Sequence, residues 1–173
     1  HIDFGENKIQ EALEKWSDIK NDFPHIQLHM IGKLQTNKVK YAIKLFDYIH
    51  SLDNMKLAEK ISTEQKKQNK KIKIFIQVNI GNEQQKSGIN KSQLQDFYLF
   101  CKRLNLNVVG LMCIPPIDQN TISFFKEMET LKNDLKLNEL SMGMSSDYIE
   151  ASHFSSTFLR IGSGILVKEV NKF

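Results

Sequence analysis

The stretch LSMGMSSDYIEASHFSSTFLRIGSG, residues 140–164, contains the pattern of strand, helix and strand that indicates the fold. Its apolar start predicts a strand that ends at Ser145, followed by a helical segment opening at Ser145 or Ser146 and by a second strand that runs into Arg160 and Gly162. The backbone N–H groups of such strand ends, Ser/Gly turns and helix starts lack partners and can bind a phosphate. Together with the positive charge of Arg160, they predict an anion site.

The same alternation of strand and helix extends over the rest of the chain. The segment 72–80 gives the strongest strand signal, because its β-branched residues suit a sheet and its apolar second half suits a strand covered on both faces. Periodicity predicts the remaining strands at residues 2–5, 26–31, 48–51 and 108–114, helices at 6–20, 35–46, 91–104 and 121–137, a helix capped by Asp53 that extends through Ile61, and a helical tail from Ile165.

Seven short strands alternating with six helices predict an α/β protein built from right-handed βαβ units around a parallel sheet. A closed (β/α)8 barrel requires eight strands, whereas an open doubly wound sheet tolerates seven. Periodicity alone leaves both architectures open. The 173 residues, 40% of them hydrophobic, suffice for one core, so we expect a single domain over residues 1–173.

Composition argues against several classes of function. The net charge of +4 is modest, and the lysine-rich run at 66–71 is typical of a solvated helix end; without interleaved aromatic residues it does not indicate a nucleic-acid patch. No apolar run is long enough to cross a bilayer. Cys101 and Cys113 lack metal-ligand spacing and are interpreted as reduced, buried thiols. We therefore expect a cytoplasmic protein that binds neither nucleic acid nor membranes.

Ligands of both candidate folds bind where parallel strands end, so the residues that follow each strand are the informative ones. They form a polar ring of Glu6, Asn7, Gly32, Lys33, Ser51, Asp53, Asn79, Pro115, Ser145, Arg160 and Gly162, with His29 able to point inward beside them. The ring contains no nucleophile–base pair, which favours holding a ligand over transforming it.

Each of these residues also has a purely structural interpretation. Asn7 and Asp53 suit helix caps, the glycines suit tight turns or close packing, and His29 and His50 suit hydrogen-bonded core histidines. The methionines at 112, 142 and 144 suit core packing. Arg160 is different, because burying an arginine without a partner is costly, so we expect a partner for it.

Seven motifs occur along the chain in the same order as in a known family: FGEN (4–7), HMIGKLQTNK (29–38), IHSLD (49–53), VNI (78–80) with KSG (86–88), GLMCIP (110–115), LSMGMS (140–145) and RIG (160–162). In these motifs the sequence resembles the pyridoxal phosphate homeostasis protein family. The resemblance implies a (β/α)8 barrel of the fold-type III pyridoxal-phosphate class, similar to the N-terminal domain of alanine racemase. It favours the barrel over the open sheet.

The resemblance also implies roles for six residues. Ser145 and the backbone around Gly162 and Ser163 would hold the cofactor phosphate, and Arg160 would face the pyridine nitrogen. Asn7 and His29 would line the cofactor. In the family, the lysine that forms a Schiff base with pyridoxal phosphate precedes the FGEN motif. We therefore expect the first β/α unit and its lysine to be missing from this chain, which makes covalent attachment doubtful.

The leading hypothesis is a non-catalytic protein that buffers and delivers pyridoxal phosphate, with pyridoxal-phosphate-dependent apo-enzymes as possible recipients. One alternative is a racemase-like enzyme, for which the sequence lacks the lysine base and a second domain. Another is an incomplete barrel chain that keeps only a phosphate site. Because a barrel short of one strand leaves two open sheet edges, we expect a monomer or a weak homodimer.

Overall fold

The computed structural model describes residues 1–83, 87–116 and 120–165. Within these ranges, seven parallel strands form one sheet in which every ladder joins a strand to the next strand along the chain. The strands are β1 (Asp3–Glu6), β2 (Gln27–Met30), β3 (Tyr48–Leu52), β4 (Lys73–Val78), β5 (Asn107–Cys113), β6 (Glu139–Met144) and β7 (Phe158–Arg160).

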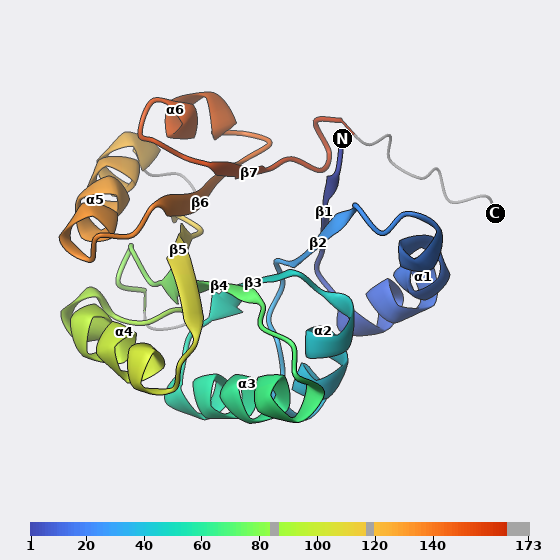
Figure 1. Cartoon of the computed structure of the whole chain (residues 1–173). Coiled ribbons are helices and arrows are strands. Elements are labelled where there is room, and N and C mark those ends of the chain that lie inside the picture. Colours follow the sequence, from blue (N-terminus) through green and yellow to red (C-terminus); the bar gives the residue numbers. More distant parts are fainter. Residues whose placement is uncertain (84–86, 117–119, 166–173) are drawn as a thin grey trace.

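Helices alternate with the strands and surround the curved sheet, as Figure 1 shows. They are α1 (Ile9–Asp22), α2 (Val39–Leu45), α3 (Met55–Gln68), α4 (Leu94–Arg103), α5 (Thr121–Asp134) and α6 (Tyr148–Ser152), with 3-10 turns η1 (Thr36–Lys38) and η2 (Lys91–Gln93) leading into α2 and α4. A doubly wound sheet reverses its strand order at a switch point, whereas this order is sequential. The barrel prediction is confirmed, and the described sheet has seven strands without a ladder between β1 and β7.

The sheet curves around a small interior of its own. The large apolar cluster packs between the outer face of the sheet and the helices, and a second cluster of Tyr48, Phe75 and Met112 lies on the inner face with Phe158 against it. The ring of Phe158, from the last strand, has its centroid 5.5 Å from that of His29 in the second strand. Contact between strands so far apart in the order requires strong curvature. Strand β4, buried on both faces after its first residue, confirms its predicted place in the core.

Four local predictions are wrong. Asn7 does not cap α1, because the N-cap of that helix is Lys8 and no side chain caps it. The cap of α3 is Asn54, whose side chain accepts a hydrogen bond from the N–H of Leu57 at 2.9 Å, and not Asp53. The helix expected at Ser145 or Ser146 begins only at Tyr148, because the intervening residues form a turn. Met144, expected in the core, is 40% exposed.

The packing of α6 against the end of β6 requires a glycine at position 143. Gly143 has a φ of +93°, and a β-carbon there would lie 2.6 Å from the β-carbon of Ala151 in α6. Only glycine meets both demands without strain. Gly143 therefore allows α6 to fold back against β6.

The predicted helical tail from Ile165 falls almost entirely outside the described residues.

Cys101 and Cys113 are buried free thiols, as predicted, and burial raises the pKa of each to about 12. In the described ranges, no helix combines the length and the apolar character needed to cross a membrane.

Candidate functional site

Arg160 stands at the carboxyl end of β7 and reaches across to two neighbouring strands. One terminal nitrogen donates a hydrogen bond to the hydroxyl of Ser141 in β6, and the other donates to the carbonyl oxygen of Cys113 in β5, each at 2.8 Å. These bonds fix the plane of the guanidinium while leaving further N–H groups available. The partner expected for Arg160 is therefore a pair of neutral oxygens.

The charge of Arg160 has no carboxylate in contact with it among the described residues. Desolvation by burial lowers the pKa of its guanidinium, and the more distant Asp147 opposes that shift only in part. A partly buried cation held by neutral oxygens favours an electron-rich ligand atom or an anion. Arg160 is thus positioned as a donor for a ligand.

The loops after β6 and β7 meet beside Arg160. A β-carbon at Gly164 would lie 3.7 Å from the hydroxyl oxygen of Ser145, so the two loops are in contact. The loop after β7 turns back on itself through a hydrogen bond from the N–H of Ile165 to the carbonyl of Gly162 at 3.0 Å. A β-carbon at Gly162 would meet no atom within 4 Å, which leaves open space above this turn.

The donors of these loops are uncommitted. Within the described part of the chain, neither the Ser145 hydroxyl nor the N–H groups of Ser163 and Gly164 form a hydrogen bond. Grouped hydroxyl and backbone N–H donors next to open space are what a phosphate requires. The donor set therefore fits a phosphate, although it consists of two loops and not of the helix start first expected.

Asn7 stands apart from this group, at the carboxyl end of β1. Its side chain is exposed and bonds to no described residue. Its backbone is locked against β2, because a β-carbon at Gly32 would lie 2.1 Å from the Asn7 carbonyl oxygen. Gly32 is thus required for close packing at this strand end.

His29 lies deeper than the mouth of the barrel and is 4% exposed. Its Nε2 is 3.0 Å from a carboxylate oxygen of Asp3, and its Nδ1 is 3.0 Å from Nε2 of His50. Nδ1 of His50 in turn is 2.8 Å from the hydroxyl of Ser141, the residue that also binds Arg160. Both histidines are hydrogen-bonded in the core, as their structural interpretation predicts, and they connect to the site through Ser141.

Burial controls the protonation of this histidine pair. It lowers the pKa of His29, although the nearby Asp3 carboxylate raises it in part. It lowers the pKa of His50 well below the usual value, and both His29 and Arg160 add to that effect. Both imidazoles are therefore neutral at pH 7.

Sequence reasoning missed Asp3 and Ser141 as parts of the site. Asp3 is at the start of β1 and Ser141 is in the middle of β6, whereas the search concentrated on residues that follow strand ends. The available signal was alternation, since His29, His50, Ser141 and Arg160 all point to the inner face of the sheet.

A cavity of about 240 Å3 opens at the same end of the barrel, beside the carboxyl ends of β4 and β5. Its lining includes Gln77, Asn79 and Ile114. Neither it nor any other part of the described ranges groups three or more His, Cys, Asp or Glu side chains in a metal-binding arrangement. The carboxyl end thus offers donors and space for an organic ligand.

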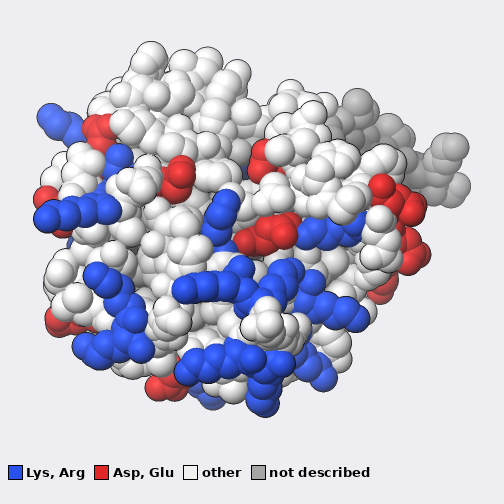
Figure 2. Space-filling view, in the orientation of Figure 1, with Lys and Arg blue, Asp and Glu red and all other residues white. Residues whose placement is uncertain are grey.

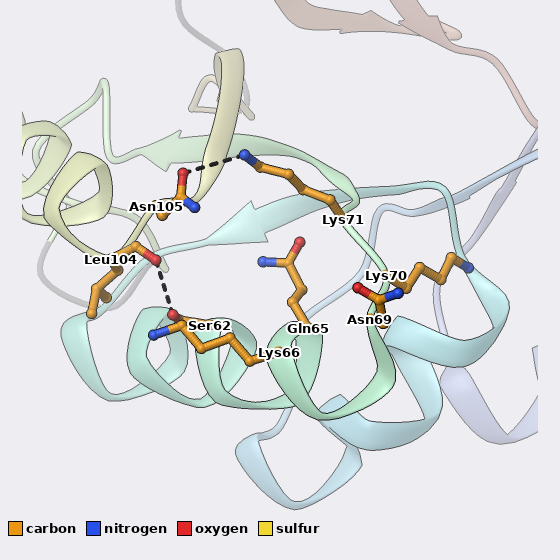
Figure 3. A pocket seen from close by; sticks show the side chains of 8 residues that line it. All are labelled: Ser62, Gln65, Lys66, Asn69, Lys70, Lys71, Leu104 and Asn105. Carbon is orange, nitrogen blue, oxygen red and sulfur yellow. Dashed lines mark hydrogen bonds between the residues drawn. The ribbon is translucent and has the colours of Figure 1, made fainter.

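A second pocket, of about 220 Å3, lies at the opposite end of the barrel, where α3 leads into β4 (Figure 3). Two of its lysines are committed to the fold: Nζ of Lys70 donates to the carbonyls of Lys44 and Phe46 at the end of α2, at 3.1 and 3.0 Å. Lys71 donates to the side chain of Asn105 at 3.3 Å. Lysines at helix C-termini complement the helix dipole.

The surrounding surface shows many lysines with acidic side chains among them, over the lower part of the view in Figure 2. Lys66 and Lys67 are in the last turn of α3. The interpretation of the run 66–71 as a helix end is therefore confirmed.

Comparison with known proteins places the chain in a family. Residues 2–168 match the family described as "Alanine racemase, N-terminal domain". The pyridoxal phosphate homeostasis protein of Aquifex aeolicus (strain VF5) is 37% identical over 170 residues, which cover 92% of this chain and 74% of that protein. The chain belongs to the alanine racemase N-terminal domain family and, within it, to the pyridoxal phosphate homeostasis proteins, as the seven sequence motifs indicated.

Solved structures agree with this assignment. PipY of Synechococcus elongatus PCC7942, solved with pyridoxal phosphate bound, superposes with a TM-score of 0.85 at 32% identity, over 93% of this chain and 79% of PipY. Alanine racemase of Clostridium difficile 630 superposes with a TM-score of 0.71 at 13% identity, over 92% of this chain and 43% of the racemase. The second likeness concerns the fold alone.

Proposed function

We propose that this chain binds pyridoxal phosphate and acts in the homeostasis of that cofactor, buffering and delivering it without catalysis of its own. The observation that carries the proposal is Arg160, a partly buried cation held by Ser141 and the Cys113 carbonyl with N–H groups to spare. PipY, a relative over most of this chain, binds the same cofactor.

The residues present fit the cofactor part by part. The Ser145 hydroxyl and the N–H groups of Ser163 and Gly164 are uncommitted donors, and they would bind the phosphate together with the backbone at Gly162, which adjoins open space. Arg160 would donate to the pyridine nitrogen. Asn7 would line the mouth of the site.

His29 is proposed to line the cofactor from below. Its ring nitrogens are already bonded to Asp3 and His50, so it would offer a ring face or edge and not a new hydrogen bond. His29 would therefore contribute to binding through van der Waals contact and not through a hydrogen bond.

The hydrogen bonds of the two histidines support a carrier over an enzyme. When bound, pyridoxal phosphate supplies an aldehyde that reacts with amines and a ring that withdraws electrons. A guanidinium at the ring nitrogen would disfavour protonation of that nitrogen and so weaken the electron withdrawal of the ring. The imidazoles of His29 and His50 are bonded to each other and to Asp3 and Ser141, so neither is free to act as a base.

Binding by these residues is proposed to be non-covalent. The two lysines of the HMIGKLQTNK motif, Lys33 and Lys38, are exposed and half-buried respectively, and in the described structure neither side chain forms a hydrogen bond or ion pair with the donor set. Borohydride treatment of the complex followed by peptide mass analysis checks this. A native lysine carrying the reduced cofactor contradicts the non-covalent proposal.

The remaining aspects follow the same proposal: a cytoplasmic protein, monomeric or weakly dimeric, that binds no nucleic acid and passes the cofactor to apo-enzymes. Light scattering at increasing concentration tests the oligomeric state. The lysines of the pocket in Figure 3 that cap helix ends support the absence of nucleic-acid binding, and a polarisation assay at low salt tests it.

Titration with pyridoxal phosphate, followed by the absorbance of the cofactor, is the decisive experiment. We expect saturable one-to-one binding that inorganic phosphate competes away. Binding of inorganic phosphate without binding of pyridoxal phosphate would favour the incomplete barrel with a phosphate site only. Racemisation of alanine in the presence of the cofactor would favour the enzyme.

A further inference from the structure

A continuous chain of hydrogen bonds crosses the interior of the barrel from β1 to β7. It has four links between side chains, which join Asp3 to His29, His29 to His50, His50 to Ser141, and Ser141 to Arg160. The heavy-atom distances in this order are 3.0, 3.0, 2.8 and 2.8 Å. These four distances are all within the normal range for hydrogen bonds.

The two ends of the chain determine the position of every proton in it. An ionised Asp3 can only accept, so Nε2 of His29 must carry the proton. A neutral imidazole carries a single N–H, so Nδ1 of His29 accepts from Nε2–H of His50. For the same reason, Nδ1 of His50 accepts from the hydroxyl of Ser141.

The hydrogen bond between Ser141 and Arg160, at the other end of the chain, agrees with these proton positions. Arg160 can only donate, and Ser141 accepts from it through a lone pair while giving its own proton to His50. Each of the four links then contains one proton. The Nδ1–H tautomer of His29 would leave its link to Asp3 without a proton, and the Nδ1–H tautomer of His50 would leave the link between the two histidines without one.

Packing holds the two imidazoles in these orientations. The His29 ring stacks on Tyr48 with centroids 4.2 Å apart and planes 11° from parallel. The His50 ring stacks on Phe75 with centroids 4.3 Å apart and planes 20° from parallel. Ser141 is fully buried, so water does not compete for its hydroxyl.

We propose that Asp3, His29, His50 and Ser141 form a proton-ordered chain that positions Arg160, and that Ser141 and His50 are thereby positioning residues for the ring nitrogen of the bound ligand. Because Ser141 accepts from Arg160 and gives its own proton away, it cannot compete as a donor at the ligand. Arg160 carries donors only, and the chain fixes the direction in which its remaining N–H groups face, which suits a ligand ring whose nitrogen carries a lone pair. The statement about the ligand rests on the proposed function, whereas the order of the protons does not.

The first test needs no ligand and no variant. Long-range 1H–15N correlation spectra of the imidazoles at pH 7 distinguish the two neutral tautomers and the imidazolium. We expect His29 and His50 both as neutral Nε2–H tautomers. An Nδ1–H tautomer or an imidazolium at either histidine overturns the chain.

The second test removes one link. Ser141→Ala is expected to move the Nδ1 resonance of His50 toward that of an unbonded imine nitrogen and to weaken pyridoxal phosphate binding about tenfold, as for a hydrogen bond to a charged group. The matched control is Ser62→Ala, because Ser62 is also buried and donates to a carbonyl, that of Leu104 at 2.9 Å, far from the site. The control should change neither quantity.

An analogue of the cofactor separates positioning from general damage. In the carbocyclic analogue, CH replaces the ring nitrogen, so Arg160 has no lone pair to bind. Ser141→Ala should leave the affinity for this analogue within about twofold of that of the unchanged protein. An equal loss for the cofactor and the analogue would show a merely structural role and overturn the proposal. If the unchanged protein binds no pyridoxal phosphate, the proposed function fails, and the imidazole spectra still decide whether the chain is proton-ordered.

Discussion

The two ends of the barrel differ in what their polar groups do. At the amino end, the pocket of Figure 3 is rich in lysine, yet Lys70 and Lys71 donate to helix-terminal carbonyls and to Asn105. At the carboxyl end there is a single arginine, but the donors of Ser145, Ser163 and Gly164 are uncommitted. Uncommitted donors, more than density of charge, therefore distinguish a ligand site from a structural one.

The largest expected effect is at Arg160. Arg160→Met removes the partly buried guanidinium of the carboxyl end and should weaken pyridoxal phosphate binding about 100-fold. The other arginine of the chain, exposed Arg103, provides a matched control, and Arg103→Met should leave the affinity unchanged. Equal affinities of the two variants in an absorbance titration would refute the role of Arg160.

The next effect is at the phosphate donors. Ser145→Ala removes an uncommitted hydroxyl and should weaken binding of pyridoxal phosphate about tenfold, as for one hydrogen bond to an anion. Competition by inorganic phosphate should weaken in parallel. Ser146→Ala, an exposed neighbour in the same turn, is the control. Losses of equal size for the two serines would show that the turn matters and not the hydroxyl.

As the pH falls, protonation should destabilise the proton-ordered chain before it affects the amino end of the barrel. Burial lowers the pKa values of His29 and His50 in the folded protein, so the unfolded chain takes up protons first as the pH falls below 6.5. The free energy of unfolding should therefore be highest above pH 6.5 and should fall on acidification, by up to about 1.4 kcal/mol per pH unit for each histidine. The charged groups that face the pair are Asp3, Asp47, Lys73 and Arg160.

Urea unfolding between pH 7.5 and pH 5 measures this slope. His50→Asn should flatten it, whereas replacing exposed His153 by Gln should not. A slope that is the same in both variants would show that other groups cause the acid sensitivity.

The smallest effect is expected at the amino end. Lys70→Met removes two hydrogen bonds to the end of α2 and should lower the free energy of unfolding by about 1 kcal/mol without changing cofactor affinity. Exposed Lys66 provides the control, since Lys66→Met should change the stability by less than about 0.5 kcal/mol. A loss of cofactor affinity in Lys70→Met would remove the distinction between the two ends.

The strands of the middle of the sheet could be predicted from the sequence because each contains a run of apolar residues between segments with helical periodicity. The segment 72–80 illustrates this, since its hydrophobicity suits burial on both faces whatever its neighbours are. The choice of barrel over open sheet did not follow from periodicity. It required the strand order, which depends on contacts between strands and was supplied in advance only by the family resemblance.

The site could be predicted only where a residue is informative by itself. Arg160 was found because an arginine in an apolar strand is expensive, but its partners are a hydroxyl and a carbonyl that no spacing in the sequence marks. Asp3 and Ser141 were missed because their importance arises from pairing across the barrel. The cap was placed at Asp53 and not at Asn54 because both residue types suit the position, and backbone geometry selects between them.

The sequential order of the strands has a consequence for how the chain folds. Because every ladder joins a strand to its immediate successor, the segment closed by each pairing contains only one helix and its turns. Short closures cost little entropy, so the sheet can grow one strand at a time from whichever pair forms first. The proton-ordered chain is different, because its link between His50 in β3 and Ser141 in β6 joins strands that are three positions apart in the sheet. This link forms only when β3, β4, β5 and β6 are all in place. The residues that position Arg160 are therefore among the last to come together, and assembly of the ligand site reports completion of the barrel.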